Sequence, residues 1–412
     1  MSGLRILVVC PHFAPDTAPT GVVMTRIVSE LGAAGHEVHV VTTLPWYRDH
    51  RIEEDWQRVT WKDRTRPTEW GSVTRLNPFA GSDKRNLLRR ALGFIGFSST
   101  AAVAGIRVRS SGRIDAVIAM SPPLTLGLTG WIVALWRRAP LVFNIQDVFP
   151  DAAIETGAIT NRFVIVVARL LEKSTYTLSK RITVLSDDLA DNVRAKIGPR
   201  RDRVVVIPNF VDTENIRPLS RMTSYREELG LGERPVVMYA GNIGYSQSLE
   251  LLVEAARALP HVDFVINGNG SARTTLEVEA RGVSNLVFGD FQPAERLAEV
   301  LATGDVHVVP LRRGLGRVSV PSKTYSIMAA GRPIVAAVDA GTEVTRLVDG
   351  AECGIVVGPD SPSEFIEAIR RLTDDPEGSA DMGRRARAYV EQQASPRAVA
   401  ERYADLVREF RR

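Results

Sequence analysis

The sequence predicts an α/β protein made of two parallel-sheet domains in tandem. Short apolar runs alternate with helical segments along the chain, and one polar stretch near the middle interrupts the alternation. The length of 412 residues also exceeds what one hydrophobic core usually organises. We therefore expect two doubly wound domains, with a ligand cleft between them at the carboxyl ends of their strands.

The first domain is expected over residues 1–210. It opens with the strand RILVVC, the proline-containing loop HFAPDTAPTG, the helix VVMTRIVSELGAAG and the strand EVHVVTT, which together form one unit of a parallel sheet. The apolar runs DAVIAM, APLVFNI, RITVLS and RVVVIPN continue the strand series. Helices are predicted between them at 124–137, 160–178 and 187–197.

The second domain is expected over residues 235–390, after a linker at 211–234 that is polar and rich in turn residues. Its predicted strands are PVVMYAG, DFVINGNG, LVFGDF, VHVVPL, PIVAAV and GIVVG, with helical segments between most of them. The remaining residues, 391–412, form an amphipathic helix with a basic end.

Composition and motifs exclude several classes of protein. The net charge of +4 is too small to indicate nucleic-acid binding. The two cysteines lie beside apolar runs, and the six histidines form no ligand-like cluster, so we expect neither a protein-bound metal nor a cofactor. The pair Gly268 and Gly270 lacks the third glycine of a dinucleotide fingerprint, and no P-loop is present. No apolar run of about 18 residues appears, so we expect a cytoplasmic protein.

The segment 84–113 has a charge pattern that suits an anionic membrane surface. It contains seven basic residues and no acidic residue, and the basic residues flank the apolar stretch LGFIGFSSTAAVAG. We expect Arg85 and Arg89 to contact lipid headgroups, and Phe94 and Phe97 to enter the bilayer. The alternative is a core helix with a solvated basic end.

Three loops of the second domain follow predicted strands and have the residues of a nucleotide pocket. Gly241 and Gly244 lie in YAGNIGYSQS, and Gly268 lies in INGNGSAR. Glycines let an anionic ligand approach backbone amides, although each alone would be an ordinary turn residue.

The third loop leads into the helix of VPSKTYSIMAAG, where Ser322 is a capping hydroxyl and Lys323 lies at the helix start. A lysine is unfavourable there unless an anion is bound, so we expect Lys323 to contact a pyrophosphate.

Many segments of the chain resemble the GT-B glycosyltransferases of family 4. They include PHFAPDTAPTGVVMTRIVSELGAAGHEVHVVT, NIQDVFPDAAIETGAI, VVVIPNFVDTENIRPL, VVMYAGNIGYSQSLELLVEAA and VPSKTYSIMAAGRPIVAAVDAGTEV, in the family's order and over nearly the full length. The branch that the chain most resembles includes colanic acid and O-antigen transferases of the N-acetylfucosamine type.

The resemblance implies a retaining transfer of a sugar, such as an N-acetylated hexosamine, from a nucleoside diphosphate without a protein-bound metal. The donor, expected to be a UDP-sugar, would bind the second domain. A lipid-linked or glycan acceptor would enter through the first domain, at the inner face of the plasma membrane. The resemblance also implies that the helix at 391–412 packs back against the first domain.

The sequence departs from the family at its pair of glutamates. Val318 and Ser326 occupy those positions, so the usual ribose and sugar contacts cannot be transferred to this chain. Asn242 stands near a place where the family commonly has a cation on the diphosphate. We expect Lys323, helped by Arg317, to supply the missing positive charge.

The remaining candidates concern the acceptor and the donor hydroxyls. Asp147 follows a predicted strand and is a candidate to bind a hydroxyl or to take the acceptor's proton. His12 also follows a strand, and the amide of Gly21 begins a helix that would face the diphosphate. Glu343 is a candidate ligand of a donor hydroxyl, with a structural role as its alternative.

Two other functions fit the same fold. A GT-B sugar-nucleotide epimerase would need neither an acceptor nor a membrane. A non-catalytic module would bind the nucleotide sugar without turnover, which the missing glutamates make a real alternative.

Overall fold

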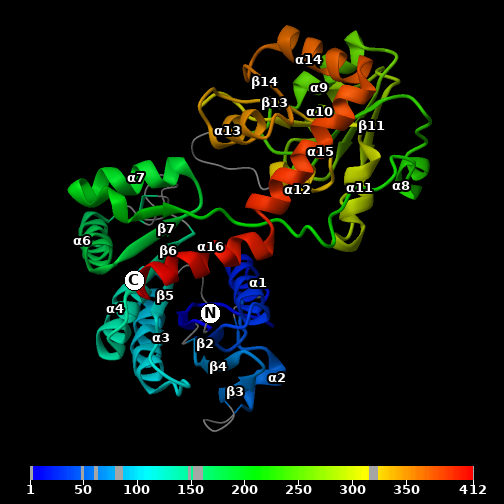
Figure 1. Cartoon of the computed structure of the whole chain (residues 1–412). Helices are drawn as coiled ribbons and strands as arrows, with labels where there is room; N and C mark the ends of the chain where they lie inside the picture. Colours follow the sequence, from blue (N-terminus) through cyan, green and yellow to red (C-terminus); the bar gives the residue numbers. More distant parts are fainter. Residues whose placement is uncertain are drawn as a thin grey trace. The chain divides into compact units, whose positions relative to one another are not determined.

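The computed structural model describes residues 3–47, 51–59, 64–78, 87–146, 150–151, 161–314 and 323–411, without the side chains of 87–92. The chain forms two compact units, each built on one sheet (Figure 1). Unit 1 contains Met1–Asn209 together with Pro396–Arg412, and unit 2 contains Phe210–Ser395.

Unit 1 has an eight-stranded sheet of order β3-β4-β2-β1-β5-β6-β7-β8, in which β3 is antiparallel to β4 and the other pairs are parallel. The strands are β1 (Arg5–Val9), β2 (Glu37–Thr43), β3 (Thr65–Thr68), β4 (Gly71–Leu76), β5 (Ala116–Ser121), β6 (Leu141–Ile145), β7 (Arg181–Val184) and β8 (Val204–Val206). The central strands are buried on both faces, which explains their continuous apolar runs.

The helices of unit 1 are α1 (Pro19–Ala33), α2 (Glu54–Gln57), α3 (Leu87–Arg107), α4 (Thr125–Arg137), α6 (Arg162–Leu178), α7 (Asp187–Ile197) and α16 (Pro396–Arg408), with the 3₁₀ segments η2 (Gly198–Arg203) and η4 (Glu409–Arg411). The chain runs from β1 to β2 in one direction along the sheet and from β5 through β8 in the other. Right-handed crossovers therefore place α1 on one face and α4, α6 and α7 on the opposite face. Helix α3 packs against α4, and α16 packs against α1 (Figure 1).

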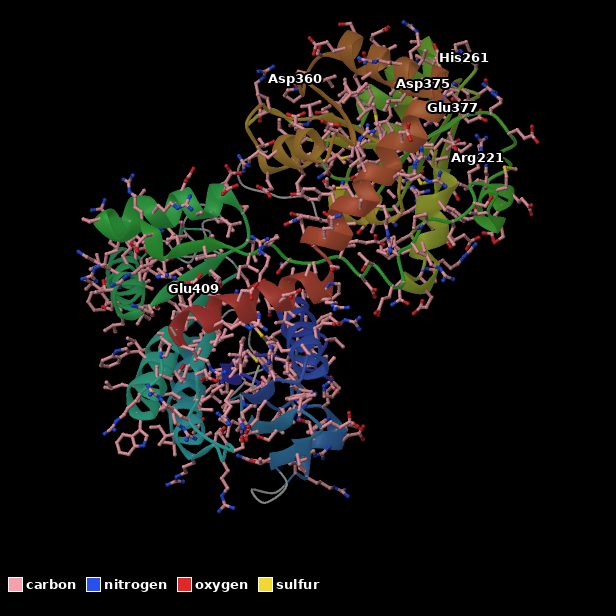
Figure 2. All side chains as sticks on the ribbon, in the orientation of Figure 1. Arg221, His261, Asp360, Asp375, Glu377 and Glu409 are labelled. Atoms are coloured by element: carbon pink, nitrogen blue, oxygen red, sulfur yellow. The ribbon has the colours of Figure 1, made fainter. Side chains whose placement is uncertain are left out.

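The C-terminal helix is anchored in unit 1 by buried polar contacts. Tyr403 is buried, and its hydroxyl accepts a hydrogen bond of 2.6 Å from Nδ2 of Asn144 on β6. Beyond the helix, Glu409, which is labelled in Figure 2, pairs with Arg181 at 3.1 Å. Arg411 pairs with Asp115 at 2.6 Å. The chain therefore returns to unit 1 after completing unit 2.

Unit 2 has a six-stranded sheet of order β11-β10-β9-β12-β13-β14 with every pair parallel. Its strands are β9 (Val236–Ala240), β10 (Asp263–Asn267), β11 (Leu286–Gly289), β12 (Val306–Pro310), β13 (Ile334–Ala337) and β14 (Gly354–Val357). Its helices are α8 (Ser224–Glu228), α9 (Glu250–Ala258), α10 (Arg273–Glu279), α11 (Leu297–Thr303), α12 (Lys323–Ala329), α13 (Glu343–Gly350), α14 (Pro362–Asp374) and α15 (Pro376–Gln393), with the 3₁₀ segment η3 (Ala294–Arg296). The strand order reverses between β9 and β12, where an open α/β sheet usually binds its ligand.

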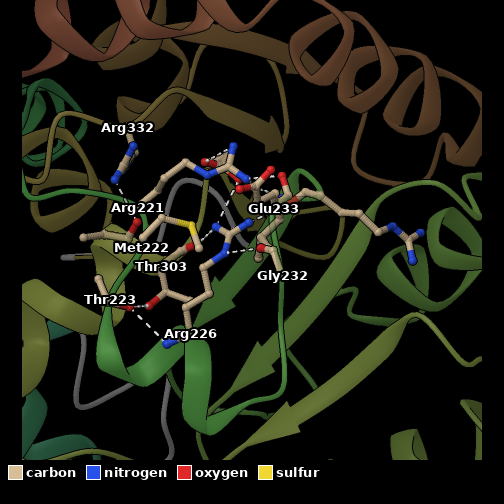
Figure 3. Close-up of polar contacts among 12 residues, drawn as sticks. Arg221, Met222, Thr223, Arg226, Gly232, Glu233, Thr303 and Arg332 are labelled. Carbon is tan, nitrogen blue, oxygen red and sulfur yellow. Dashed lines mark hydrogen bonds and ion pairs between the residues drawn. The ribbon is translucent and has the colours of Figure 1, made fainter.

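The segment 211–234, expected to be a linker, is packed into unit 2. Arg226 of α8 has a fully buried side chain that donates to the backbone oxygens of Gly232 at 2.8 Å and Thr303 at 2.9 Å (Figure 3). The same guanidinium pairs with Asp305 at 3.3 Å. A buried charge needs such partners, so these contacts hold the segment against the rest of unit 2.

Candidate functional site

In unit 2, two glycine loops meet at the carboxyl ends of β9 and β10. The amide of Gly241 donates to the backbone oxygen of Asn267 at 2.9 Å, and Ile243 donates to Asn269 at 2.9 Å. Gly268 has φ of +139°, and a Cβ atom there would lie 1.9 Å from the backbone oxygen of Gly241. Only glycine fits at this position, because a side chain would force the two loops apart.

The backbone amides of these glycines have hydrogen-bond partners within the chain, and their contact with a donor stays a prediction. Besides the Gly241 amide, that of Gly244 donates to Oε1 of Gln247 at 3.0 Å, and that of Gly268 donates to the oxygen of Gly289 at 3.1 Å. The glycines allow close backbone packing, which shapes the edge of the sheet beside Lys323.

Lys323 is the first residue of α12, and its side chain reaches across to the end of β9. The ammonium donates to the hydroxyl of Tyr239 at 2.9 Å and lies 4.2 Å from the centre of that ring. A Cβ atom on Gly241 would lie 3.4 Å from Nζ, so the glycine leaves room for the cation. Lys323 and the Gly241 loop thus come together at the reversal between β9 and β12.

Burial lowers the pKa of Lys323 to about 8. Within the part of the chain that the structure describes, no carboxylate lies within ion-pair distance of its ammonium. Burial also raises the pKa of Tyr239, so this hydroxyl stays neutral and offers no counter-charge. A half-buried ammonium whose described neighbours are neutral is suited to receive an anion.

Tyr239 and Arg312 are two residues of this edge that sequence reasoning missed. Tyr239 donates to the backbone oxygen of Asn242 at 2.6 Å, and so links Lys323 to the loop. Arg312 follows β12, donates to the oxygen of Tyr245 at 2.7 Å and pairs with Glu250 at 3.0 Å. Tyr239 resembles an ordinary core residue in its apolar run, but Arg312 lies two residues after a strand at the reversal point, which was a usable signal.

Glu343 lies in the first turn of α13, after the N-cap Thr342, and is buried. One of its carboxylate oxygens pairs with Arg346 at 2.9 Å. The structure therefore gives Glu343 a definite structural contact, while its contact with a donor hydroxyl stays a prediction.

In unit 1, His12 lies three residues after the end of β1 and forms a pair with a buried aspartate. Nδ1 of His12 lies 2.7 Å from Oδ2 of Asp16, and the ring stacks on Trp46 with centroids 5.6 Å apart. An ionised carboxylate only accepts hydrogen bonds, so in the neutral imidazole Nδ1 carries the proton and Nε2 the lone pair. Nε2 has no hydrogen-bond partner among the described residues. This arrangement can take a proton from a hydroxyl group.

Gly21 lies in the first turn of α1, which begins two residues earlier than expected, at Pro19. A Cβ atom at Gly21 would lie 2.8 Å from Cβ of His12. Gly21 therefore allows the helix to pack closely on the His12 loop. Its proposed contact with a diphosphate stays a prediction.

Asp147, Ser322, Arg85, Arg317 and Val318 lie outside the described residues. Asp151, the other aspartate near β6, pairs with Lys196 at 2.6 Å and accepts from Asn192 at 3.2 Å. Burial acts to raise the pKa of Asp151, but the hydrogen bonds from Lys196 and Asn192 lower it overall. No three His, Cys, Asp or Glu side chains within the described ranges gather as a metal site would require.

The membrane prediction for Phe97 is wrong. Its side chain is only 2% exposed and packs in the core of unit 1, because it lies on the face of α3 that meets the sheet. Phe94 is half-buried, and Arg89 lies in α3 where side chains are not described. Among the described residues, no helix combines the length and the apolar character that crossing a bilayer requires.

Two family models match the chain and together cover most of it. The Glycosyl transferase 4-like domain matches residues 20–209, and the Glycosyl transferases group 1 model matches residues 234–375. The chain belongs to the GT-B glycosyltransferases of groups 4 and 1. Each model falls within one of the two structural units.

Similar proteins give this glycosyltransferase a context. WcaI of Escherichia coli K12, assigned as a glycosyl transferase of colanic acid biosynthesis, is 26% identical over 89% of this chain and 92% of its own. The alpha-D-kanosaminyltransferase of Streptomyces kanamyceticus is 30% identical over 59% of this chain and 64% of its own. The probable glycosyltransferase WbjE of Pseudomonas aeruginosa is 26% identical over 80% of this chain and 83% of its own.

Solved structures show the same fold. HepE of Anabaena, in complex with UDP, has a TM-score of 0.66 at 15% identity and covers 98% of this glycosyltransferase and 100% of HepE. WaaG, a glycosyltransferase involved in lipopolysaccharide biosynthesis, has a TM-score of 0.59 at 18% identity, with coverage of 97% and 99%.

Proposed function

We propose that this glycosyltransferase transfers a sugar, such as an N-acetylated hexosamine or deoxyhexosamine, from a UDP-sugar to a lipid-linked or glycan acceptor during cell-envelope polysaccharide biosynthesis. The observation that carries the proposal is Lys323, a half-buried cation at the strand reversal of unit 2 with no carboxylate partner among the described residues. The names of WcaI and WaaG support the polysaccharide context, and the UDP complex of HepE supports the donor class.

The chemistry of transfer explains why a cation is needed at this place. Breaking the anomeric bond leaves negative charge on the departing diphosphate and positive character on the sugar ring. A fixed ammonium with few competing partners stabilises that developing charge without reorganising. Tyr239 holds the Lys323 ammonium beside the Gly241 loop, so the cation is in position before the donor binds.

On the acceptor side, His12 is the candidate proton acceptor that the structure describes. Asp16 fixes the imidazole tautomer, and Nε2 is left to accept the proton of an attacking hydroxyl. Asp147 stays a second candidate for the same role or for binding a hydroxyl. Glu343, Asn242 and Ser322 are proposed contacts of the donor.

The direct test is a panel of UDP-, GDP- and dTDP-sugars assayed by thermal shift, followed by assay of the stabilising donor for sugar transfer to lipid-linked acceptors. Stabilisation by one UDP-sugar and by UDP itself, followed by formation of a glycosylated lipid, is the expected result. Binding that yields an isomerised sugar would indicate an epimerase, and binding without any product would indicate a non-catalytic module. No stabilisation by any member would contradict the proposed donor site.

A further inference from the structure

The outer surface of α3, α4 and α6 is the most apolar exposed region among the described parts of unit 1. Ten large apolar side chains on these helices are exposed: Ile95, Val103, Ile132, Leu135, Trp136, Phe163, Val164, Val166, Val167 and Leu170. Helix α4 packs against both α3 and α6, and Figure 1 shows α3 and α4 side by side, so the three helices form one continuous surface. We call it the α3-α4-α6 face.

Several of these side chains have most of their surface exposed to solvent. Trp136 and Leu135 at the end of α4 are 71% and 64% exposed, and Phe163 at the start of α6 is 76% exposed. An apolar surface of this breadth marks a site of interaction.

The charges around the face identify its partner. Helices α3 and α4 contain no acidic residue, and the single acid of α6, Glu172, is buried against Tyr176 and Lys196. Basic residues are frequent in or directly beside the three helices: Arg89, Arg90, Arg107, Arg109, Arg137, Arg138, Arg162, Arg169 and Lys173. An apolar surface bordered by cations and free of exposed acids complements a bilayer rich in anionic lipids.

The face ends at α7, the next helix on this side of the sheet. Its first turns carry Asp187, Asp188 and Asp191, and none of its large apolar side chains is exposed. Its last turn carries Arg194 and Lys196, so α7 presents polar side chains of both charges, and the loss of exposed apolar side chains gives the face a defined limit.

We infer that the α3-α4-α6 face docks this glycosyltransferase on an anionic bilayer, with Trp136 and Phe163 as the main apolar contacts. The inference deepens the proposed function, on which it rests for its biological purpose, because a docked enzyme meets a lipid-linked acceptor at the membrane surface. In this inference the membrane is contacted by exposed side chains of α4 and α6, and not by Phe97, which is buried in the core.

The test is flotation of the full-length protein with vesicles of phosphatidylcholine alone or with about 30% phosphatidylglycerol. Two double variants remove the apolar contacts: Leu135→Ser with Trp136→Ser, and Phe163→Ser with Val167→Ser. Phe291→Ser in unit 2 is the matched control, because Phe291 is also 76% exposed. All four replaced side chains of unit 1 lie at the surface, and thermal unfolding verifies that the variants are folded.

We expect the wild-type protein and the Phe291→Ser control to float with anionic vesicles, and each double variant to partition about tenfold less. Wild-type protein that stays unbound, or double variants that float like the wild type, would overturn the inference. So would a stable dimer by light scattering that dissociates in the double variants, since a second copy would then be the partner.

The same variants, tested with UDP by thermal shift, separate this inference from the proposed function. If the wild-type protein does not float but UDP stabilises it normally, only the docking inference is wrong. If flotation depends on Trp136 and Phe163 but UDP does not stabilise the protein, the docking inference holds and the proposed donor site is wrong.

Discussion

The carboxyl edges of the two sheets differ in how their charged groups are paired. In unit 2, the Lys323 ammonium faces a tyrosine ring and hydroxyl, and no carboxylate neutralises it within the described residues. In unit 1, His12 is held by the buried carboxylate of Asp16. An uncompensated cation suits the binding of an anion, whereas a histidine oriented by an aspartate suits the transfer of a proton. The same type of sheet edge therefore supports two different chemical tasks.

Replacing His12 tests most strongly whether the edge of unit 1 serves proton transfer. We expect His12→Ala to lower kcat by about 10²-fold or more, because a positioned base contributes that much to proton transfer. UDP affinity, measured by calorimetry, should stay unchanged, and Asp16→Asn should give an intermediate kcat. A kcat within about threefold of wild type would leave His12 with a structural role only.

Gly268→Ala tests the packing of the two loops of unit 2. The new Cβ atom would lie 1.9 Å from the oxygen of Gly241 in a backbone of φ +139°, so we expect a loss of about 3 kcal/mol in the free energy of unfolding. Gly282→Ala is the control, since φ is +81° there and no atom lies within 4 Å. That control should lower the free energy of unfolding, measured by chemical denaturation, by only about 1 kcal/mol. Equal losses in the two variants would show that the loop contact is not tight.

The pH dependence of UDP binding tests the charge of Lys323. Its pKa is about 8 in the unliganded protein, and only the protonated form attracts a diphosphate. UDP affinity should thus be highest below pH 8 and fall roughly tenfold or more by about pH 9.5 as the ammonium loses its proton. Because the N3–H of uracil also ionises in this range in both ligands, the ratio of UDP affinity to uridine affinity is the quantity that should fall. A UDP affinity that does not change with pH would separate Lys323 from the diphosphate.

The smallest effect is expected on the stability of the unliganded protein. Because burial lowers the pKa of Lys323 in the folded state, the unfolded chain binds more protons between about pH 8 and 10.4. The charge thus opposes folding at neutral pH, and this cost disappears as the pH rises through that window. Lys323→Met should raise the midpoint of thermal unfolding by a few degrees at pH 7 and by less at pH 10. Lys180→Met, at an exposed position, should leave the midpoint of thermal unfolding unchanged at both pH values.

Most of the strands that the sequence predicted are buried on both faces, whereas the predicted strands β8, β11 and β14 are partly exposed. Their continuous runs of Val, Ile and Leu stand out from the surrounding helices. Strands β3 and β4 were missed because they lie at the edge of the sheet, are more polar, and include Pro67, which is tolerated on an edge strand. The polar composition of 211–234 predicts a linker, but Arg226 and apolar side chains such as Tyr225 and Leu231 are buried in unit 2.

The candidate site was predictable where a residue has an unusual type for its position. Lys323 at a helix start and Gly241 and Gly268 after strands are such positions, and the structure brings them together in unit 2. The occupied glycine amides and the role of Tyr239 depend on how separate loops bond to each other, which no local pattern contains. Likewise, the charge pattern located α3, but which of its faces is buried depends on packing against neighbouring elements, so Phe97 was misplaced.

The central claim is that Lys323 binds the diphosphate of the donor, and calorimetric titration of UDP and uridine against wild type and Lys323→Met tests it most directly. The account predicts that the variant weakens UDP binding by about 30-fold, as expected for a lost charge-assisted hydrogen bond, while uridine binding changes less than about twofold. Equal weakening of both ligands, or unchanged UDP affinity, would contradict the claim.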